Sequence, residues 1–217
     1  MSNGHISRIF RCLFLSKFNV ITGGEDSNLA LWCIQTGECL KRWKAHDGSP
    51  IWSLTRCQNR HVITGGGDGS LKRFSCDLKR SSLFHVKLDF EKNDYPKLVG
   101  LMKNDSKNIL VLTHSGILMK VDVEQEEDEE GEGFASNQIV LTDPELENHA
   151  IMKHTSSYAY FATLTGKIKW LCLRTFQFHH QIAIEGKILA LEVLENGPEI
   201  DINVLVCGVG GKYILKN

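Results

Sequence analysis

Residues 20–32 read VITGGEDSNLALW and residues 62–74 read VITGGGDGSLKRF, so one pattern returns without gaps after 42 residues. Upstream, Gly4-His5 aligns with Ala45-His46 at an offset of 41 residues. Each copy holds a His, an apolar run, the letters VITGGxD and a second run that ends in an aromatic residue. A period of this length indicates a repeat architecture, in which one supersecondary unit recurs along the chain.

Each copy consists of segments with the length and pattern of β-strands. The runs 29–32 and 51–54 are short and apolar or alternating, as strands are. The Gly-Gly-x-Asp segment predicts a tight reversal, because Gly tolerates positive φ and Asp bonds to its own turn backbone. A second turn at 36–38 and a fourth strand at 39–43 follow. Four short strands in such a unit are typical of one β-propeller blade.

The repeat resembles that of the WD40 family. The family pattern has a Gly-His dipeptide, a hydroxyl residue shortly before a turn Asp, and a Trp after that Asp. The first copy matches it at Gly4, His5, Thr22, Asp26 and Trp32. The second matches it at His46, Thr64 and Asp68, with Ala45 in place of Gly and Phe74 in place of Trp.

The resemblance implies that these His, hydroxyl, Asp and Trp side chains form a hydrogen-bonded network that joins three strands of a blade. The second blade should lose the last link, because Phe has no N–H to donate. A His with an Asp and a hydroxyl also looks like a catalytic triad. We favour the structural interpretation, because the set recurs in each repeat and points into the blade.

Three weaker copies at 109–121, 160–171 and 204–215 keep the strand, Gly turn and strand but lack the Asp. First strands precede them at 98–102, 150–153 and 188–194. We therefore expect an all-β, partial WD40 β-propeller over residues 1–217, with about five blades whose last one lacks its outer strand. The expected blades are 4–44, 45–90, 95–142, 148–184 and 186–217. We expect a part of a longer protein, with a self-contained five-blade ring as the alternative.

The net charge of −1 hides a strong asymmetry. Residues 1–121 hold 18 Lys or Arg against 10 Asp or Glu, whereas residues 122–133 hold eight acids and no base. Such a block repels itself, so we expect a disordered insertion at 122–137. It is either a surface insertion without a task or a loop that docks a partner. The odd number of seven cysteines fits reduced thiols, and we expect a soluble, cytoplasmic chain that binds no membrane.

Nothing in the sequence predicts an enzyme. The Gly-rich segments at 65–70 and 208–213 lack the helix, or the Ser or Thr, of a phosphate site. His149, His154, His179 and His180 do not have the spacing of zinc ligands. Each Cys lies on or beside an expected strand, where a small buried apolar side chain is the common role. We expect no catalytic residue, no cofactor and no metal.

Nucleic-acid binding stays open, because basic residues gather on the expected outer strands of the first two blades. They could form a face that holds phosphates, or they could be charges that keep strand edges soluble. The candidate RNA-binding residues are Lys41, Arg42, Lys44, Lys72, Arg73, Lys79 and Arg80.

The segments 4–11, 24–26, 31–32 and 60–66 further resemble one branch of the WD40 family, which consists of large proteins with several propellers. This likeness is good over about residues 4–76 and holds only in outline beyond. It implies a non-catalytic partner of an S-adenosylmethionine-dependent tRNA 2′-O-methyltransferase, which modifies the wobble ribose of the anticodon. The chain would position tRNA for that enzyme. The alternative is a general protein–protein scaffold without RNA contact.

Overall fold

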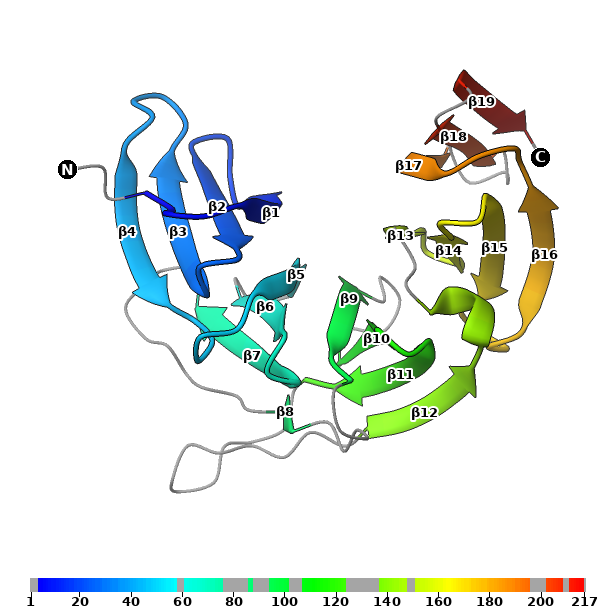
Figure 1. Ribbon diagram of the computed structural model, residues 1–217, viewed down its shortest axis with the longest axis horizontal. Coiled ribbons are helices and arrows are strands. Elements are labelled where there is room, and N and C mark those ends of the chain that lie inside the picture. The colour runs from blue at the N-terminus through cyan, green and yellow to red at the C-terminus, as the bar shows by residue number, and fades with distance from the viewer. Residues whose placement is uncertain are drawn as a thin grey trace.

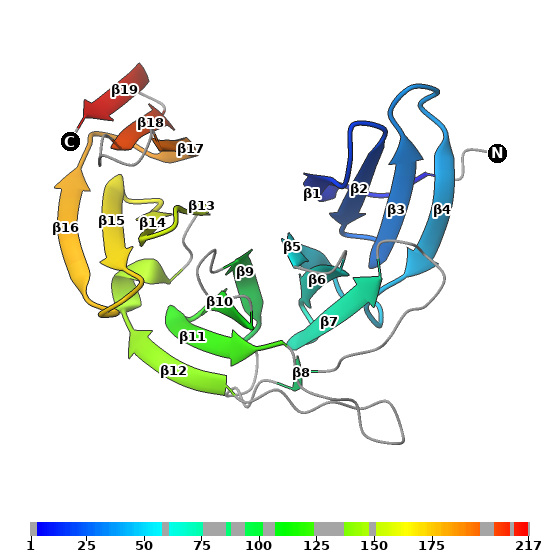
Figure 2. The ribbon, with the colours of Figure 1, turned by 180° about the vertical axis from the view of Figure 1, so that it is seen from behind.

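Five antiparallel sheets stand side by side around a common axis and form an open arc (Figures 1 and 2). In this computed structural model the described residues are 4–57, 61–75, 86–87, 94–101, 107–123, 137–147, 151–195, 202–208 and 211–216. In every sheet, neighbouring strands follow one another in the chain. The first strand of each sheet lies on the inside of the arc (Figure 1). This architecture is a partial β-propeller, as the repeat predicts.

The first two sheets contain the two strong copies of the repeat. The first sheet consists of β1 (Ile9–Phe14), β2 (Asn19–Gly24), β3 (Asn28–Cys33) and β4 (Cys39–Lys44). The second consists of β5 (Ile51–Cys57), β6 (His61–Gly66), β7 (Ser70–Ser75) and β8 (Val86–Lys87).

The three weaker copies form the other sheets. The third sheet consists of β9 (Pro96–Leu101), β10 (Asn108–Thr113), β11 (Ile117–Asp122) and β12 (Asn137–Thr142). The 3-10 helix η2 (Pro144–Leu146) leads to the fourth sheet of β13 (Ile151–His154), β14 (Tyr158–Ala162), β15 (Lys167–Cys172) and β16 (Phe178–Ala183). In the described part of the chain, the fifth sheet has β17 (Ile188–Glu195), β18 (Ile202–Gly208) and β19 (Gly211–Lys216).

Apolar side chains fill the space between each pair of neighbouring sheets. Between the first two sheets, Ile21 and Leu31 pack against Val62 and Phe74. On the other side of the second sheet, Ile63 packs with Val111 of the third. Consecutive strand residues point to opposite faces, so Val62 and Ile63 are buried in different clusters. This two-sided burial explains why the central strands read as apolar runs.

The glycines of the repeat have a different role from the one we expected. Gly23, Gly24, Gly65 and Gly66 lie in strands, and the positive φ values occur later in the turns, at Ser27 (63°) and Gly69 (80°). The glycines are needed for close approach. A Cβ on Gly24 would lie 2.3 Å from the carbonyl oxygen of Arg8, and one on Gly66 would lie 2.2 Å from the His46 ring.

Both ends of the expected acidic insertion, residues 122–123 and 137, are part of the folded third blade. β11 extends through Asp122, and Val123 is buried in the core between the second and third sheets. Asn137 already belongs to β12. Residues 124–136, which hold most of the acidic tract, lie outside the described residues, as do Lys79 and Arg80.

Candidate functional site

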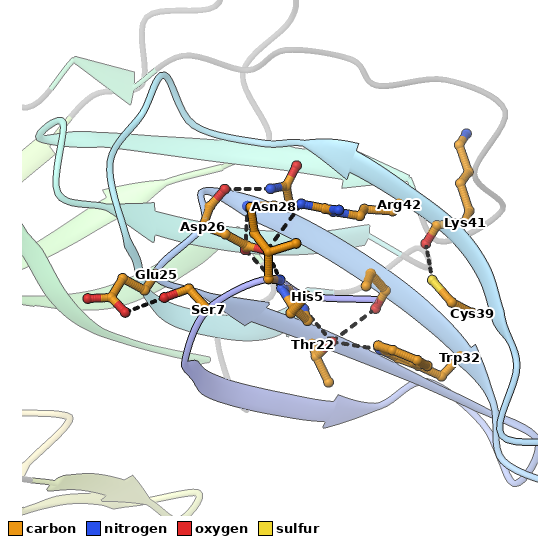
Figure 3. Close-up of polar contacts among 12 residues, drawn as sticks. His5, Ser7, Thr22, Glu25, Asp26, Asn28, Trp32, Cys39, Lys41 and Arg42 are labelled. Carbon is orange, nitrogen blue, oxygen red and sulfur yellow. Dashed lines mark hydrogen bonds and ion pairs between the residues drawn. The ribbon is translucent and has the colours of Figure 1, made fainter. Parts of the chain in front are cut away.

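The first blade contains the network that the WD40 resemblance implies (Figure 3). His5 Nδ1 donates to Asp26 Oδ1 at 2.8 Å, and His5 Nε2 lies 2.8 Å from Thr22 Oγ1. Trp32 Nε1 donates to the same Thr22 oxygen at 2.7 Å. Asp26 also accepts the backbone N–H of Asn28, so the carboxylate closes its own turn. The network therefore ties the segment before β1 to β2 and β3.

The second blade repeats these contacts at the aligned positions. His46 Nδ1 donates to Asp68 at 2.9 Å, and His46 Nε2 lies 2.8 Å from Thr64 Oγ1. Phe74 takes the place of Trp32 and is buried beside Trp43, with ring centroids 6.3 Å apart. The His46 side chain is fully buried, and those of His5 and Asp26 are 3% exposed. The Asp68 side chain is 21% exposed, but the enclosure of both His rings supports a structural role over a triad.

The Asp68 carboxylate should make stability sensitive to acid. Burial alone would raise the pKa of Asp68, but the hydrogen bond and charge of His46 and the bonds from Ser70 outweigh it and lower that pKa. This stabilisation is complete above the unfolded pKa of about 4 and is lost as the pH falls toward the lower folded value. We expect the urea concentration at the midpoint of unfolding to decrease as the pH is lowered below about 4. The decrease should be less steep in Asp68→Asn. Parallel curves for both proteins would contradict this role of Asp68.

A substitution that restores the family Trp in the second blade should destabilise the protein. Phe74 is 3% exposed and packs with Ile51 and Val62, so Phe74→Trp inserts a larger ring into a filled core. Overpacking of this kind costs about 1–3 kcal/mol, whereas one new hydrogen bond to Thr64 contributes about 1 kcal/mol. Urea denaturation measures the difference. A gain in stability would show that the missing N–H matters more than the volume.

The third blade replaces the network with different residues. Asp94, before β9, accepts the backbone N–H of Ser115 at 3.0 Å and the Ser115 hydroxyl at 2.5 Å. Ser115 Oγ lies 3.1 Å from Thr113 Oγ1, and Thr113 in turn accepts the N–H of Ile117. An acid from the entering loop thus takes over the role of the missing turn Asp. Sequence alignment missed it because the acid lies in another segment.

The basic residues that we expected to share one face are held in different ways. Arg42 pairs with Asp26 at 3.3 Å, and Lys44 pairs with Asp47 at 3.2 Å. Lys72 is only 5% exposed. Arg73 donates to the carbonyl oxygen of Val123 at 2.7 Å, and so links the second blade to the third. Lys41 is exposed, with its ammonium 5.7 Å from the centre of the Trp43 ring.

The expected basic face is therefore wrong in its composition. β7 lies inside the second blade, so its alternating side chains point toward the first and third sheets and are covered by them. Among the described candidates, only Lys41 and Lys44 are exposed to solvent as whole residues. Their contact with RNA stays a prediction.

The expectation of buried cysteines is also wrong for four of them. Cys12 is exposed, and Cys33, Cys39 and Cys172 are partly exposed, because they lie at strand ends or on the face of the first sheet away from the second. Hydrogen bonds from Thr36 lower the pKa of Cys33, and those from Thr175 lower the pKa of Cys172.

A row of stacked rings, which the sequence did not reveal as a unit, crosses the inner strands of three blades. Phe10 of β1 stacks on Trp52 of β5, with centroids 4.8 Å apart and planes 8° apart. Trp52 stacks on Tyr95, which precedes β9, at 5.7 Å. Tyr95 stacks on His114 of the β10–β11 turn at 4.9 Å. We call these four residues the inner ring row.

Irregularities of the inner strands place this row. One extra residue interrupts the register of β1, β5 and β9, and these extra residues are Phe10, Trp52 and Lys97. Such bulges re-aim a side chain. The Lys97 ammonium lies 3.7 Å from the centre of the Trp52 ring. The sequence signal was the offset of 42 residues between Phe10 and Trp52, which matches the repeat.

Among the described residues, no group of three or more His, Cys, Asp or Glu side chains could hold a metal ion. The described part of the chain also contains no helix with the length and hydrophobicity that crossing a bilayer requires.

Comparison with solved structures defines the class of the fold. The computationally designed Ika8 protein has 16% identity and a TM-score of 0.71, over 100% of this chain and 60% of that chain. The Swd1 (Cps50) β-propeller domain from Myceliophteria thermophila has 14% identity and a TM-score of 0.69, over 96% of this chain and 65% of that one. This chain thus spans less than two thirds of either. No family model matches the sequence, and no curated protein does. The fold is a partial β-propeller.

Proposed function

We propose that this chain is a non-catalytic scaffold that holds tRNA for an S-adenosylmethionine-dependent 2′-O-methyltransferase. The activity is the one implied by the resemblance of residues 4–76 to WD repeat-containing protein 6. The inner ring row, with Arg11 and Lys97 beside it, is the observation that supports RNA as a ligand. Aromatic rings next to cations are the usual means of holding unpaired nucleic acid. The proposal places the chain in the cytoplasm.

The scaffold would act by positioning. The partner enzyme would carry the cofactor and the chemistry, and the propeller would supply a rigid surface on which the tRNA lies in one orientation. Correct orientation of two reactants can account for a large part of a rate enhancement. Contacts to phosphates fix that orientation without reading the bases. The inner strands suit this task, because the apolar clusters between neighbouring sheets hold them in place.

Affinity purification of the tagged, full chain tests the proposal. Half of the lysate is treated with RNase before capture, and both halves are analysed for tRNA and for bound proteins. We expect a tRNA methyltransferase in both samples and tRNA only in the untreated one. Addition of the chain to that enzyme should raise its kcat/KM for tRNA. Recovery of neither tRNA nor a methyltransferase would contradict the proposal.

A protein–protein scaffold without RNA contact is the second candidate. It is favoured by the pairing of Arg42 with Asp26 and of Lys44 with Asp47, since paired cations have less charge to offer to phosphates. In the same purification, this function predicts bound proteins of other classes and no tRNA in either sample.

A further inference from the structure

Two cations beside the inner ring row have no acidic partner in the described part of the chain. Arg11, on β1, donates only to the backbone carbonyl of Phe10, at 3.0 Å. Lys97, on β9, places its ammonium against the rings of Trp52 and Tyr95, at 3.7 and 5.8 Å from their centres. Both residues are partly buried. By contrast, Arg8, Arg42, Lys44 and Lys169 all form ion pairs.

The charge of Arg11 also acts on Lys97. Burial lowers the pKa of Arg11, and burial together with the charge of Arg11 lowers the pKa of Lys97. Like charges in a partly desolvated place are unfavourable until an anion joins them. In the free protein the repulsion between these two charges is therefore uncompensated, and a bound anion would offset it.

The rings next to these cations suit a flat partner. The ring planes of Phe10 and Trp52 are nearly parallel, at 8°, and those of Trp52 and Tyr95 differ by 23°. Three consecutive blades contribute to the row, and their inner strands β1, β5 and β9 lie side by side (Figure 1). The row is thus held by the packing of the sheets and needs little ordering when a ligand binds.

We propose that Arg11, Lys97 and the inner ring row form a binding site for unpaired RNA nucleotides, with a phosphate between the two cations and a base against the Trp52 indole. This inference rests on the proposed function and names the part of the tRNA that it would hold. A duplex is excluded because its bases are stacked inside. An acidic peptide would engage the cations but has no base to stack on the Trp52 indole.

Binding would move one side chain in particular. The Lys97 ammonium covers one face of Trp52, and cation–π attraction of this kind is weaker than an ion pair that is shielded from water. An entering base would take the place of the ammonium on the indole, and the ammonium would turn to the phosphate. Arg11, on β1 of the first blade, would hold that phosphate from the other side.

Titration of the full chain with a short oligouridylate, followed by tryptophan fluorescence and anisotropy, tests the site. We expect quenching, and Trp52→Leu should weaken binding by about 5-fold to 150-fold, the usual range for one stacked base. Trp52→Phe keeps a ring in the row and should lose the quenching while keeping part of the affinity. Arg11→Gln and Lys97→Gln should each make the slope of log affinity against log salt less negative by about 0.7. Lys97→Arg, which keeps the charge, should have the slope of the parent.

Lys17→Gln is the matched control. Lys17 also lies over a ring, with its ammonium 4.8 Å from the centre of Phe18, but at the other end of β1. This variant should bind the oligouridylate as the parent does. Circular dichroism of each variant shows that the fold is retained.

Three results would overturn the site. The first is that the parent does not bind oligouridylate, and the second is that Trp52→Leu and the double variant Arg11→Gln/Lys97→Gln bind it as tightly as the parent does. The third is that the parent binds an oligoglutamate peptide more tightly than oligouridylate. Equal binding by the variants would leave the proposed function intact, because RNA would then bind elsewhere. Conversely, oligouridylate binding through this site without tRNA or methyltransferase in the purification would leave the site intact and contradict the proposed function.

Discussion

His46→Ala should lower the free energy of unfolding by about 3–4 kcal/mol. The His46 ring is fully buried, so its removal leaves a cavity between the entering segment and β6. It also removes the hydrogen bonds from the His46 ring to Asp68, at 2.9 Å, and to Thr64, at 2.8 Å. Urea denaturation followed by circular dichroism measures the loss. A change in the midpoint without a change in the slope would show that stability has changed while the surface exposed on unfolding has not.

His179→Ala is the matched control for this experiment. His179 is exposed on β16 and makes only an edge contact with Tyr158, at 5.8 Å between centroids. Its loss should change stability by less than about 0.5 kcal/mol. Equal effects of the two substitutions would show that the His–Thr–Asp network does not stabilise the second blade.

Gly65→Ala should also be strongly destabilising, by about 2–3 kcal/mol. A Cβ at this position would lie 2.4 Å from Ser53 Oγ and 2.8 Å from the carbonyl oxygen of Pro96. The Ser53 hydroxyl could move aside, but the Pro96 oxygen is part of the backbone of β9. The third blade would have to shift away from the second, which opens the apolar cluster that contains Ile63 and Val111.

Gly67→Ala, two residues further along, is the matched control. It measures how much stability changes when a glycine is replaced without the clash. Its Cβ would meet nothing nearer than Trp52 Nε1 at 3.2 Å. We expect a change below about 1 kcal/mol. In the Gly65→Ala background, Ser53→Ala should restore little stability, because the contact with Pro96 remains. Full recovery in that double variant would assign the clash to the hydroxyl alone.

The strands and turns of the first two blades could be predicted closely, because each copy has apolar runs separated by turn residues. The aligned positions of His5 and His46 correctly indicated that one contact recurs in both blades. The role of the glycines was misread. A GG pair suggests a turn, but only the neighbouring strand and the His46 ring show that the space beside Gly65 and Gly66 is already filled.

The candidate site was harder to predict than the fold. A run of Lys and Arg looks like a basic face in a sequence, but alternate residues of an inner strand point into opposite blade interfaces. Lys72 is therefore buried, while Arg73 reaches Val123. Arg11 and Lys97 did not stand out, since each is a single basic residue among apolar ones. Their proximity depends on how β1, β5 and β9 are arranged.

The sequence by itself determined the repeat unit, its strand order and the residues of the blade network, because these depend on contacts within one copy or its immediate neighbour. The tertiary structure decided which side chains share a surface. The inner ring row draws one residue from each of several segments, and register irregularities turn Phe10, Trp52 and Lys97 out of the regular strand pattern. Contacts between residues so far apart in the chain arise only from the angle between packed sheets.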